Sequence, residues 1–457
     1  MIVGSALMTG ISSVRGKPLK NYSRLLSVAL LLSVSLGTSS VCRAAEVLTL
    51  TLDQALAIAQ DKNWDIAKAK EYGQQVQGRY VEERAAALPQ FNLAANIYAD
   101  KDDSLGALGL PSAVQYHQGV DLQLTQVLFN WGKVMAAIRA AQVGLKTADQ
   151  QLRQARQATY RDVAIAFYDV LLAKELHRIA GQNLEQKTRH LDEAQRKFDA
   201  GVATDYDVLA GRVEVENARP AVIRTDNQIR VARERLRFLL GSVQQEVDAI
   251  GSLETDVAPP PTYEEALRTA SRQRPELLDR RYRIGIADEL VTIASAENKP
   301  RLDLKGGVGW RNLDVNNVQQ DGAAWTVGVF LNFPFFDGFR TSGKVQQARS
   351  DLQTQRIEEA KLLDGIALQV RNAGNDVDES AAIVQALSGT VEQAGRLLAM
   401  AEKGYEYGVK IRLEVDDAQF NLNQAQGNLA RARRDYLSAR VGLLWTMGVL
   451  GEGEPKP

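Results

Sequence analysis

Four segments of the chain alternate regularly between apolar and polar residues. In the first, apolar Phe91 and Leu93 flank Asn92, and Ile97 follows Asn96. The other three segments are 120–125, 302–310 and 325–333. A period of two over about ten residues is typical of a β-strand with one apolar and one polar face. Strands of an outer-membrane barrel have this length and pattern, and soluble hairpins packed on a core share it.

The connections inside the two strand pairs are long. Residues 101–115 and 312–324 are rich in Asp, Asn, Gln, Gly and Ser, which favour loops. We expect both segments to be surface loops, and extracellular loops if the strands cross an outer membrane.

The remaining pattern is helical, with apolar or small residues spaced by threes and fours. A helix is predicted over 52–87 and again over 263–298, each followed by a proline, Pro89 or Pro300, that stops it. From Val134 the spacing continues to about Ala200, which predicts a helix of about 65 residues rising roughly 100 Å.

Return helices follow in both halves of the chain. In the second, Val415, Ala418, Leu422, Ala425 and Leu429 alternate threes and fours, as in the seam of a coiled coil. In the first, Pro220 lies within the corresponding helix and is expected to kink or interrupt it.

The order of these elements occurs twice along the chain. Gly201 recurs as Gly408 and Gly241 recurs as Gly448, at one constant separation. The predicted organisation is a first repeat at 45–241, a Pro-containing linker at 242–261, a second repeat at 262–448 and a polar tail at 449–457. A repeat of this length is too long for a solenoid unit and indicates two copies of one half-protein.

The first 44 residues have the pattern of a secretory signal. A basic region around Arg24 precedes an apolar region at 25–36, and 42–44 form a small-x-small cleavage site. Cleavage removes Cys42, the one cysteine, and leaves a mature chain without disulfides. The alternative is a lipid-anchored protein that begins at Cys42.

Composition and charge argue against one class of partner. Hydrophobic residues make up 45% and charged residues 24% of the 457 residues, which is ordinary for an ordered protein. The full chain has a formal charge of −1, and residues 1–44 hold five Lys or Arg and no acidic residue. The mature chain is therefore more acidic, and nucleic acid is not expected as a partner.

No arrangement of residues points to catalysis. His117, His177 and His190 are the three histidines, and no pair has the spacing of a metal site. We expect no catalytic residue, no metal and no cofactor, and hence no enzyme.

Four strands in one chain cannot close a barrel. Unpaired strand edges are not tolerated in hydrocarbon, since each unsatisfied backbone group there costs several kcal/mol. Two chains give eight strands, whose interior is filled by side chains, and three give twelve, wide enough for a lumen. The polar strand faces favour the larger barrel, so we expect a homotrimer in contact with outer-membrane lipid.

The layout resembles the TolC family of trimeric outer-membrane channel-tunnels. The resemblance covers essentially the whole mature chain and lies in the helix–Pro–strand order and in four short segments: 127–132, 198–202, 333–338 and 405–409. It implies a mainly α fold with a membrane β-barrel part. Long coiled-coil helical hairpins would form a periplasmic tunnel below a shared 12-stranded barrel. The implied partners are a periplasmic adaptor protein and an inner-membrane transporter.

The helix turns are the candidate functional sites. The turns at Gly201-Val202 and Gly408-Val409 are predicted to form the periplasmic mouth and to contact the adaptor. In the resembling family, acidic side chains and a basic partner narrow the mouth and hold it shut. Those roles fall on the four residues Asp207, Lys410, Glu414 and Asp417. Plain exposed helix charges are the alternative, and Lys410 replaces an Arg that is frequent in the family, so it lacks the forked contact of Arg.

The leading functional hypothesis is therefore a passive exit duct of a tripartite efflux system, in the outer membrane and extending into the periplasm. The same duct serving type I protein secretion is an alternative that neither the fold nor the turns separate from it. A periplasmic coiled-coil spacer without a channel is the second alternative. Two pairs of amphipathic strands argue against the spacer.

Overall fold

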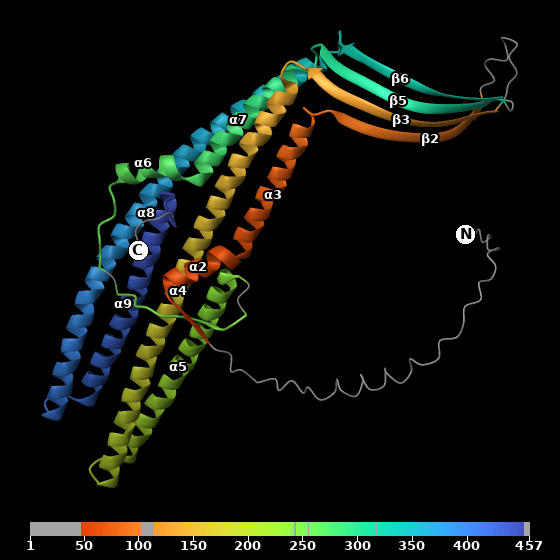
Figure 1. Ribbon diagram of the computed structural model, residues 1–457. Coiled ribbons are helices and arrows are strands. Elements are labelled where there is room, and N and C mark those ends of the chain that lie inside the picture. The colour runs from red at the N-terminus through yellow and green to blue at the C-terminus, as the bar shows by residue number, and fades with distance from the viewer. Residues whose placement is uncertain (1–46, 102–113, 242–243, 255, 316–317, 452–457) are drawn as a thin grey trace, which may run out of the picture. The chain divides into compact units, whose positions relative to one another are not determined.

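The computed structural model describes residues 47–101, 114–241, 244–254, 256–315 and 318–451. The predicted signal segment with Cys42, most of the first predicted loop and the end of the tail lie outside these residues. The chain forms long paired helices and a four-stranded sheet (Figure 1).

The first half of the chain contains seven elements. They are β1 (Leu48–Leu50), α2 (Leu52–Lys62), α3 (Trp64–Ala85), β2 (Gln90–Lys101), β3 (Val114–Phe129), α4 (Lys133–Asp199) and α5 (Asp205–Leu240).

The second half repeats this order. Its elements are β4 (Val247–Ala249), α6 (Tyr263–Gln273), α7 (Pro275–Ser295), β5 (Arg301–Val315), β6 (Val318–Asn332), α8 (Arg340–Glu406) and α9 (Arg412–Thr446).

The long helices confirm the prediction from spacing. Helices α4 and α8 have 67 residues each, and α4 packs along α5 as α8 packs along α9. Helix α5 continues across Pro220, so of the two expected effects of this proline, a kink or an interruption, the interruption does not occur. Small and apolar residues along α9, among them Ala425 and Leu429, are buried as the seam predicted.

The helix predicted at 52–87 is two helices, and so is its counterpart in the second half. The first break is at Asn63, whose side chain caps α3 by accepting hydrogen bonds from the backbone N–H groups of Asp65 and Ile66. Its amide Nδ2 also donates to the carbonyl of Leu239, 2.7 Å away, at the end of α5. The second break is at Arg274, ahead of Pro275 at the first position of α7.

Each break receives the glycine that ends a return helix. Gly241, after α5, has φ 90°, and a Cβ there would lie 2.0 Å from the carbonyl oxygen of Lys62. Gly448, after α9, has φ 75°, and its Cβ would lie 2.8 Å from the backbone nitrogen of Arg274. The same close backbone approach thus occurs in both repeats, and in each it lies between the end of the return helix and the break between the two shorter helices.

The four-stranded sheet has the order β2-β3-β5-β6, and all its pairs are antiparallel. The second predicted loop, 312–324, is wrong for most of its length. Strand β5 continues to Val315 and β6 starts at Val318, with Asn312 paired to Asp321. Polar residues that favour loops form strand here because neighbouring strands satisfy their backbone groups.

The largest apolar core lies where the two repeats meet on α4. Val163, Phe167 and Val170 of α4 pack with Leu236 of α5 and Val441 of α9. The predicted linker contributes β4, which pairs in parallel with β1 beside this core. Lys174 and Arg233 bond the Asp248 carboxylate of β4 at 2.7 and 2.9 Å.

Next to the sheet, four helices pack as neighbours in the order α3, α4, α7 and α8. This four-helix layer continues the sheet, because α3 leads into β2 and β3 into α4, while α7 leads into β5 and β6 into α8 (Figure 1). Among the described residues, no helix has both the length and the apolar content needed to cross a bilayer.

Candidate functional site

One face of the sheet is apolar across all four strands. The pairing places Leu93 of β2, Leu122 of β3, Val308 of β5 and Trp325 of β6 in one row. All four are exposed, and Trp325 is 78% exposed. Other rows of the same face add the exposed residues Phe91, Trp310, Val327, Val329 and Leu331 and the half-buried Leu124. A continuous exposed apolar face of this size indicates contact with an apolar medium.

The opposite face of the sheet is polar. Asn92, Gln123 and Thr326 share one row, and Asp121 lies one row further, 3.5 Å from Arg311. His117, singled out by the sequence, stacks on Tyr98 and lies 2.7 Å from Asp100. The sheet therefore has the two-faced character of a wall between lipid and water.

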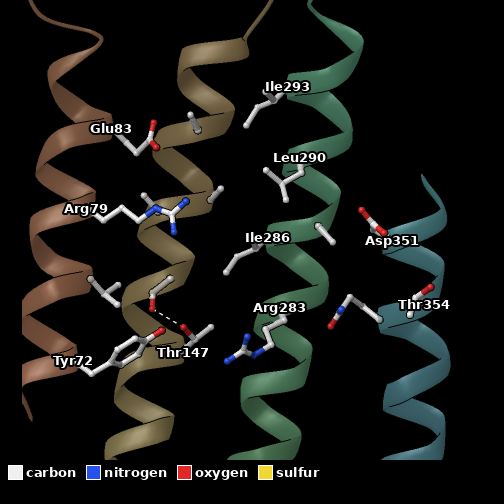
Figure 2. A pocket seen from close by; sticks show the side chains of 17 residues that line it. Tyr72, Arg79, Glu83, Thr147, Arg283, Ile286, Leu290, Ile293, Asp351 and Thr354 are labelled. Carbon is white, nitrogen blue, oxygen red and sulfur yellow. Dashed lines mark hydrogen bonds between the residues drawn. The ribbon is translucent and has the colours of Figure 1, made fainter. Parts of the chain in front are cut away.

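The four-helix layer carries a groove of about 500 Å³ on one side (Figure 2). Small residues of α4, including Ala140 and Gly144, line the groove, and α7 contributes Ile286 and Leu290. Charged side chains line it as well: Arg79 and Glu83 from α3, Arg283 from α7 and Asp351 from α8 (Figure 2). The groove is a mixed polar and apolar surface that runs across all four helices.

The first helix turn, between α4 and α5, is held by backbone bonds. Gly201 has φ 78°, and the N–H of Val202 donates to the carbonyl of Lys197, as in a Schellman motif. Val202 is 75% exposed. Asp207 belongs to the capping box of α5, where its Oδ2 accepts from the backbone N–H and the hydroxyl of Thr204. These bonds lower the pKa of Asp207.

The second turn, between α8 and α9, repeats this geometry. Gly408 has φ 74°, and the N–H of Val409, a residue that is 82% exposed, donates to the carbonyl of Gly404. The ammonium of Lys410 lies 2.6 Å from the Glu414 carboxylate. This bond and the backbone N–H of Ile411 lower the pKa of Glu414.

Within one chain, the structure therefore brings together only part of the predicted gate. Lys410 and Glu414 are bonded one helical turn apart. Asp417 is exposed on the same helix, three residues beyond Glu414, and has no ion pair among the described residues. Asp207 bonds within its own turn, which Figure 1 shows apart from the second turn.

A second cluster of charges near the turns was not predicted. Lys187 of α4 lies 2.8 Å from Asp416 of α9 and 3.1 Å from Glu214 of α5, and Arg412 lies 3.2 Å from Asp416. Next to it is His190, whose pKa is lowered by burial and by the positive charge of Arg412. Lys187 and Asp416 are 229 residues apart, so no local pattern could reveal their contact.

In the described part of the chain, no three His, Cys, Asp or Glu side chains are grouped so as to hold a metal ion. His177 lies 3.1 Å from the Thr225 hydroxyl, away from the other two histidines in sequence and in contacts.

The model of the outer membrane efflux protein family matches residues 55–242 and 266–449. The chain belongs to this family. The two matches correspond to the two repeats of the fold.

Similar proteins support the assignment over most of the chain. The outer membrane protein TolC of Escherichia coli K12 is 25% identical over 94% of this chain and 87% of its own. The alkaline protease secretion protein AprF of Pseudomonas aeruginosa is 26% identical over 73% of this chain and 70% of its own. The pyoverdine export outer membrane protein OpmQ of Pseudomonas putida is 25% identical over 87% of this chain and 85% of its own.

Solved structures show the same fold. The Campylobacter jejuni CmeC outer membrane channel superposes with a TM-score of 0.76 at 17% identity, over 88% of this chain and 87% of its own. The open state of the Neisseria gonorrhoeae MtrE outer membrane channel gives 0.72 at 20% identity, over 88% and 91%.

This efflux protein is thus a TolC-like channel of the outer membrane that extends into the periplasm, and it is a transport protein rather than an enzyme. The expected fold class is confirmed in its two repeats, its long helical hairpins and its antiparallel four-stranded sheet. The alternative of a coiled-coil spacer without a channel is excluded. The repeat boundaries and the roles of the predicted gate and turn residues stay predictions.

Proposed function

We propose that three copies of the chain form one passive exit duct, with a shared 12-stranded barrel above a helical tunnel. The observation that supports this proposal is the sheet, whose apolar face spans four strands. In the described part of the chain, β2 and β6 each have one unpaired edge. Such edges must be paired in a membrane, and pairing β2 of one copy with β6 of the next closes a barrel. Twelve strands leave a lumen.

In this assembly the polar sheet face and the groove of the four-helix layer line the conduit. The mixed lining of the groove, with Arg79 and Arg283 beside Ile286 and Leu290, suits passage of varied solutes rather than tight binding of one. A duct of this kind has no energy source, so it works with a periplasmic adaptor and an inner-membrane transporter.

The helix turns are proposed as the periplasmic mouth and as the adaptor contact. Gly201 and Val202, like Gly408 and Val409, lie at the exposed ends of their hairpins. Glu414 and Asp417 share one face of α9, and threefold repetition would place them in an anionic ring. Lys410, bonded to Glu414, partly neutralises that ring, and Asp207 fixes the neighbouring turn.

Single-channel recording in a planar bilayer tests the duct and the ring together. We expect conductance that favours cations and is blocked by divalent cations added on the periplasmic side. Glu414→Ala/Asp417→Ala should weaken both properties while the protein still forms channels. Asp226→Ala/Glu392→Ala, which removes two exposed charges from α5 and α8, is the matched control. Absence of channels would contradict the duct, and unchanged selectivity and block would contradict the ring.

Protein secretion by a type I system is the second candidate. It is favoured by the similarity to AprF, whose name describes protease secretion. A deletion strain separates the two: increased sensitivity to small toxic compounds supports efflux, whereas loss of one secreted protein supports secretion.

A further inference from the structure

Large aromatic side chains are exposed where the strands end and the long helices begin. We call these six residues the junction belt. They are Phe129, Trp131, Phe333, Phe335, Phe336 and Phe339. Phe335 is 88% exposed and Phe339 is 76% exposed. Aromatic rings this exposed are costly in water, so they indicate a partner surface.

The backbone conformation at the junction indicates that aromatic residues there serve a function. Trp131 and Gly132 have φ 56° and 81°, and the equivalent pair in the second repeat, Gly338 and Phe339, has 64° and 66°. Trp131 and Phe339 are the two non-glycine residues with positive φ among those described. Left-handed backbone is unfavourable for bulky side chains and persists mainly where it serves a function. Both repeats nevertheless keep an exposed aromatic ring in this turn.

The belt directly follows the apolar face of the sheet. Phe129 pairs with Leu302, and Leu302 pairs with Leu331, in the row of the apolar face at the helix end of the sheet. Aromatic residues at the edge of a lipid-facing band lie at the depth of the headgroups. The belt is therefore continuous with the surface that contacts the membrane, at its periplasmic boundary.

Positive charges accompany the belt. The ammonium of Lys299 lies 4.9 Å from the centre of the Trp131 ring, and exposed Arg340 directly follows Phe339. Lys133 and Lys344 share one carboxylate, that of Glu297, at 3.5 and 2.6 Å. A second carboxylate, that of Asp337, accepts hydrogen bonds from Thr341. A third, that of Asp303, lies 2.7 Å from Arg301 at the start of β5. Five cations thus accompany three carboxylates in each chain.

We propose that the junction belt and the cations beside it bind anionic phospholipid headgroups of the periplasmic leaflet in preference to neutral ones. The proposal rests on the proposed trimeric duct, in which the apolar sheet face is the lipid face. Rings at headgroup depth leave Lys299 and Arg340 within reach of lipid phosphates. Arg and Lys near a membrane surface are attracted to anionic lipids.

Tryptophan fluorescence tests the depth of the belt. The full-length protein is reconstituted in phosphatidylcholine vesicles whose lipids carry bromine close to the headgroup, and Trp131→Phe isolates the emission of Trp131 by difference. We expect strong quenching of that emission. Trp64→Phe is the matched control, because Trp64 is 64% exposed at the end of α3 distant from the sheet and should not be quenched. An unquenched Trp131 would overturn the proposal.

Native mass spectrometry tests the preference for anionic lipid. Protein extracted from vesicles of mixed phosphatidylglycerol and phosphatidylcholine should retain phosphatidylglycerol preferentially. Lys299→Gln/Arg340→Gln should reduce the retained phosphatidylglycerol several-fold. Arg189→Gln/Arg396→Gln, which removes two exposed cations from the helical hairpins, should not. Equal retention by wild type and Lys299→Gln/Arg340→Gln would overturn the proposal.

A third variant tests whether a neighbouring copy of the chain, rather than lipid, covers the belt. Phe335→Ser/Phe336→Ser should keep its trimeric mass and lose lipid retention. Dissociation into single chains would show that the belt packs on a neighbouring copy and would overturn the proposal. Conductance of the wild type in the same vesicles separates failure of the lipid-binding proposal from failure of the proposed duct. Channels without preferential lipid retention contradict the belt alone, and absence of channels contradicts the duct.

Discussion

At the scale of single residues, Lys187 and Lys410 lie near the helix turns but join different parts of the chain. The bond between Lys410 and Glu414 joins the turn before α9 to the first turn of α9. The bonds of Lys187 cross from α4 to α5 and to α9. Only the second kind of contact resists movement of one hairpin against the other, so Lys187 holds the two hairpins of a chain together near their ends.

Replacing Lys187 by Met is therefore expected to open the proposed mouth more than replacing Lys410 by Met. Lys187 and Asp416 side chains are each 17% exposed, and such a pair contributes about 1 kcal/mol per chain. Three chains multiply this effect, so the ratio of open to closed channels should rise by more than about tenfold. Single-channel open probability measures it. A larger effect of Lys410→Met would contradict this assignment.

His190 should make the same contact depend on pH. Burial and Arg412 lower its pKa, with Lys187 adding to the effect, while Asp416 and Glu193 oppose it; Glu214 of α5 completes the charged surroundings. Because the pKa of His190 is lowered in the folded state, the unfolded state binds a proton at a higher pH than the folded state does. The stability of the folded state is therefore complete at neutral pH and is lost as the pH falls through the ordinary histidine pKa.

We accordingly expect open probability to increase on mild acidification of the periplasmic side. His190→Gln should abolish that part of the response. His177→Gln is the matched control, since His177 bonds to Thr225 elsewhere on α4. An identical pH response in wild type and His190→Gln would rule out a role for this side chain.

At the scale of elements, the two helix breaks and the two ending glycines form equivalent joints. Gly241 approaches the backbone of Lys62, and Gly448 approaches that of Arg274, so neither position has room for a side chain. Each joint fixes where a return helix ends relative to the four-helix layer.

Gly241→Ala is expected to destabilise the protein by more than about 3 kcal/mol, because the methyl group meets the Lys62 carbonyl and the backbone must leave φ 90°. Gly389→Ala in α8 is the control. Nothing lies within 4 Å of a Cβ there, and alanine favours helix by about 1 kcal/mol. Denaturant unfolding compares the two, and equal stability would show that the joint is not tight.

The lipid face of the sheet can be tested in the same way. Leu122→Arg places a charge in the middle row of the apolar face, where it should cost about 2–4 kcal/mol in a bilayer. Gln123→Arg places the same charge on the polar face of the same strand and should be tolerated. Unfolding from lipid vesicles measures both, and a reversed order of stabilities would mean that the faces are assigned the wrong way round.

How far the sequence predicts these elements depends on the range of the interactions that form them. The long helices and strands follow from local periodicity, and the turn at Gly408 follows from a residue that tolerates positive φ. The break at Asn63 depends on Leu239 of α5, far along the chain. Strand β4 has three residues and forms by pairing with β1.

The contacts of the candidate site also differ in how far the sequence predicts them. Lys410 and Glu414 are four residues apart, so their bond is visible in the sequence. The contact of Lys187 with Asp416 is not, because it needs the packing of α4 on α9. The sequence singled out the segment 127–132, which contains Trp131, but it does not reveal the positive φ and the exposure that Trp131 shares with Phe339.

At the scale of the whole molecule, one chain is incomplete as a channel. Its sheet has an apolar face and a polar face but ends at β2 on one side and at β6 on the other. Its helical layer ends likewise at α3 and at α8. The sheet edge at β2 is on the same side of the chain as α3, and the edge at β6 is on the same side as α8. Joining copies side by side therefore closes the sheet and the helical layer together.

The number of chains in the membrane-extracted particle tests this account most directly. Light scattering that separates protein from detergent mass should give three chains for the wild type, because three copies supply the twelve strands that enclose a lumen. A stable single chain, or a particle of two chains, would contradict the closed duct on which the proposed function depends.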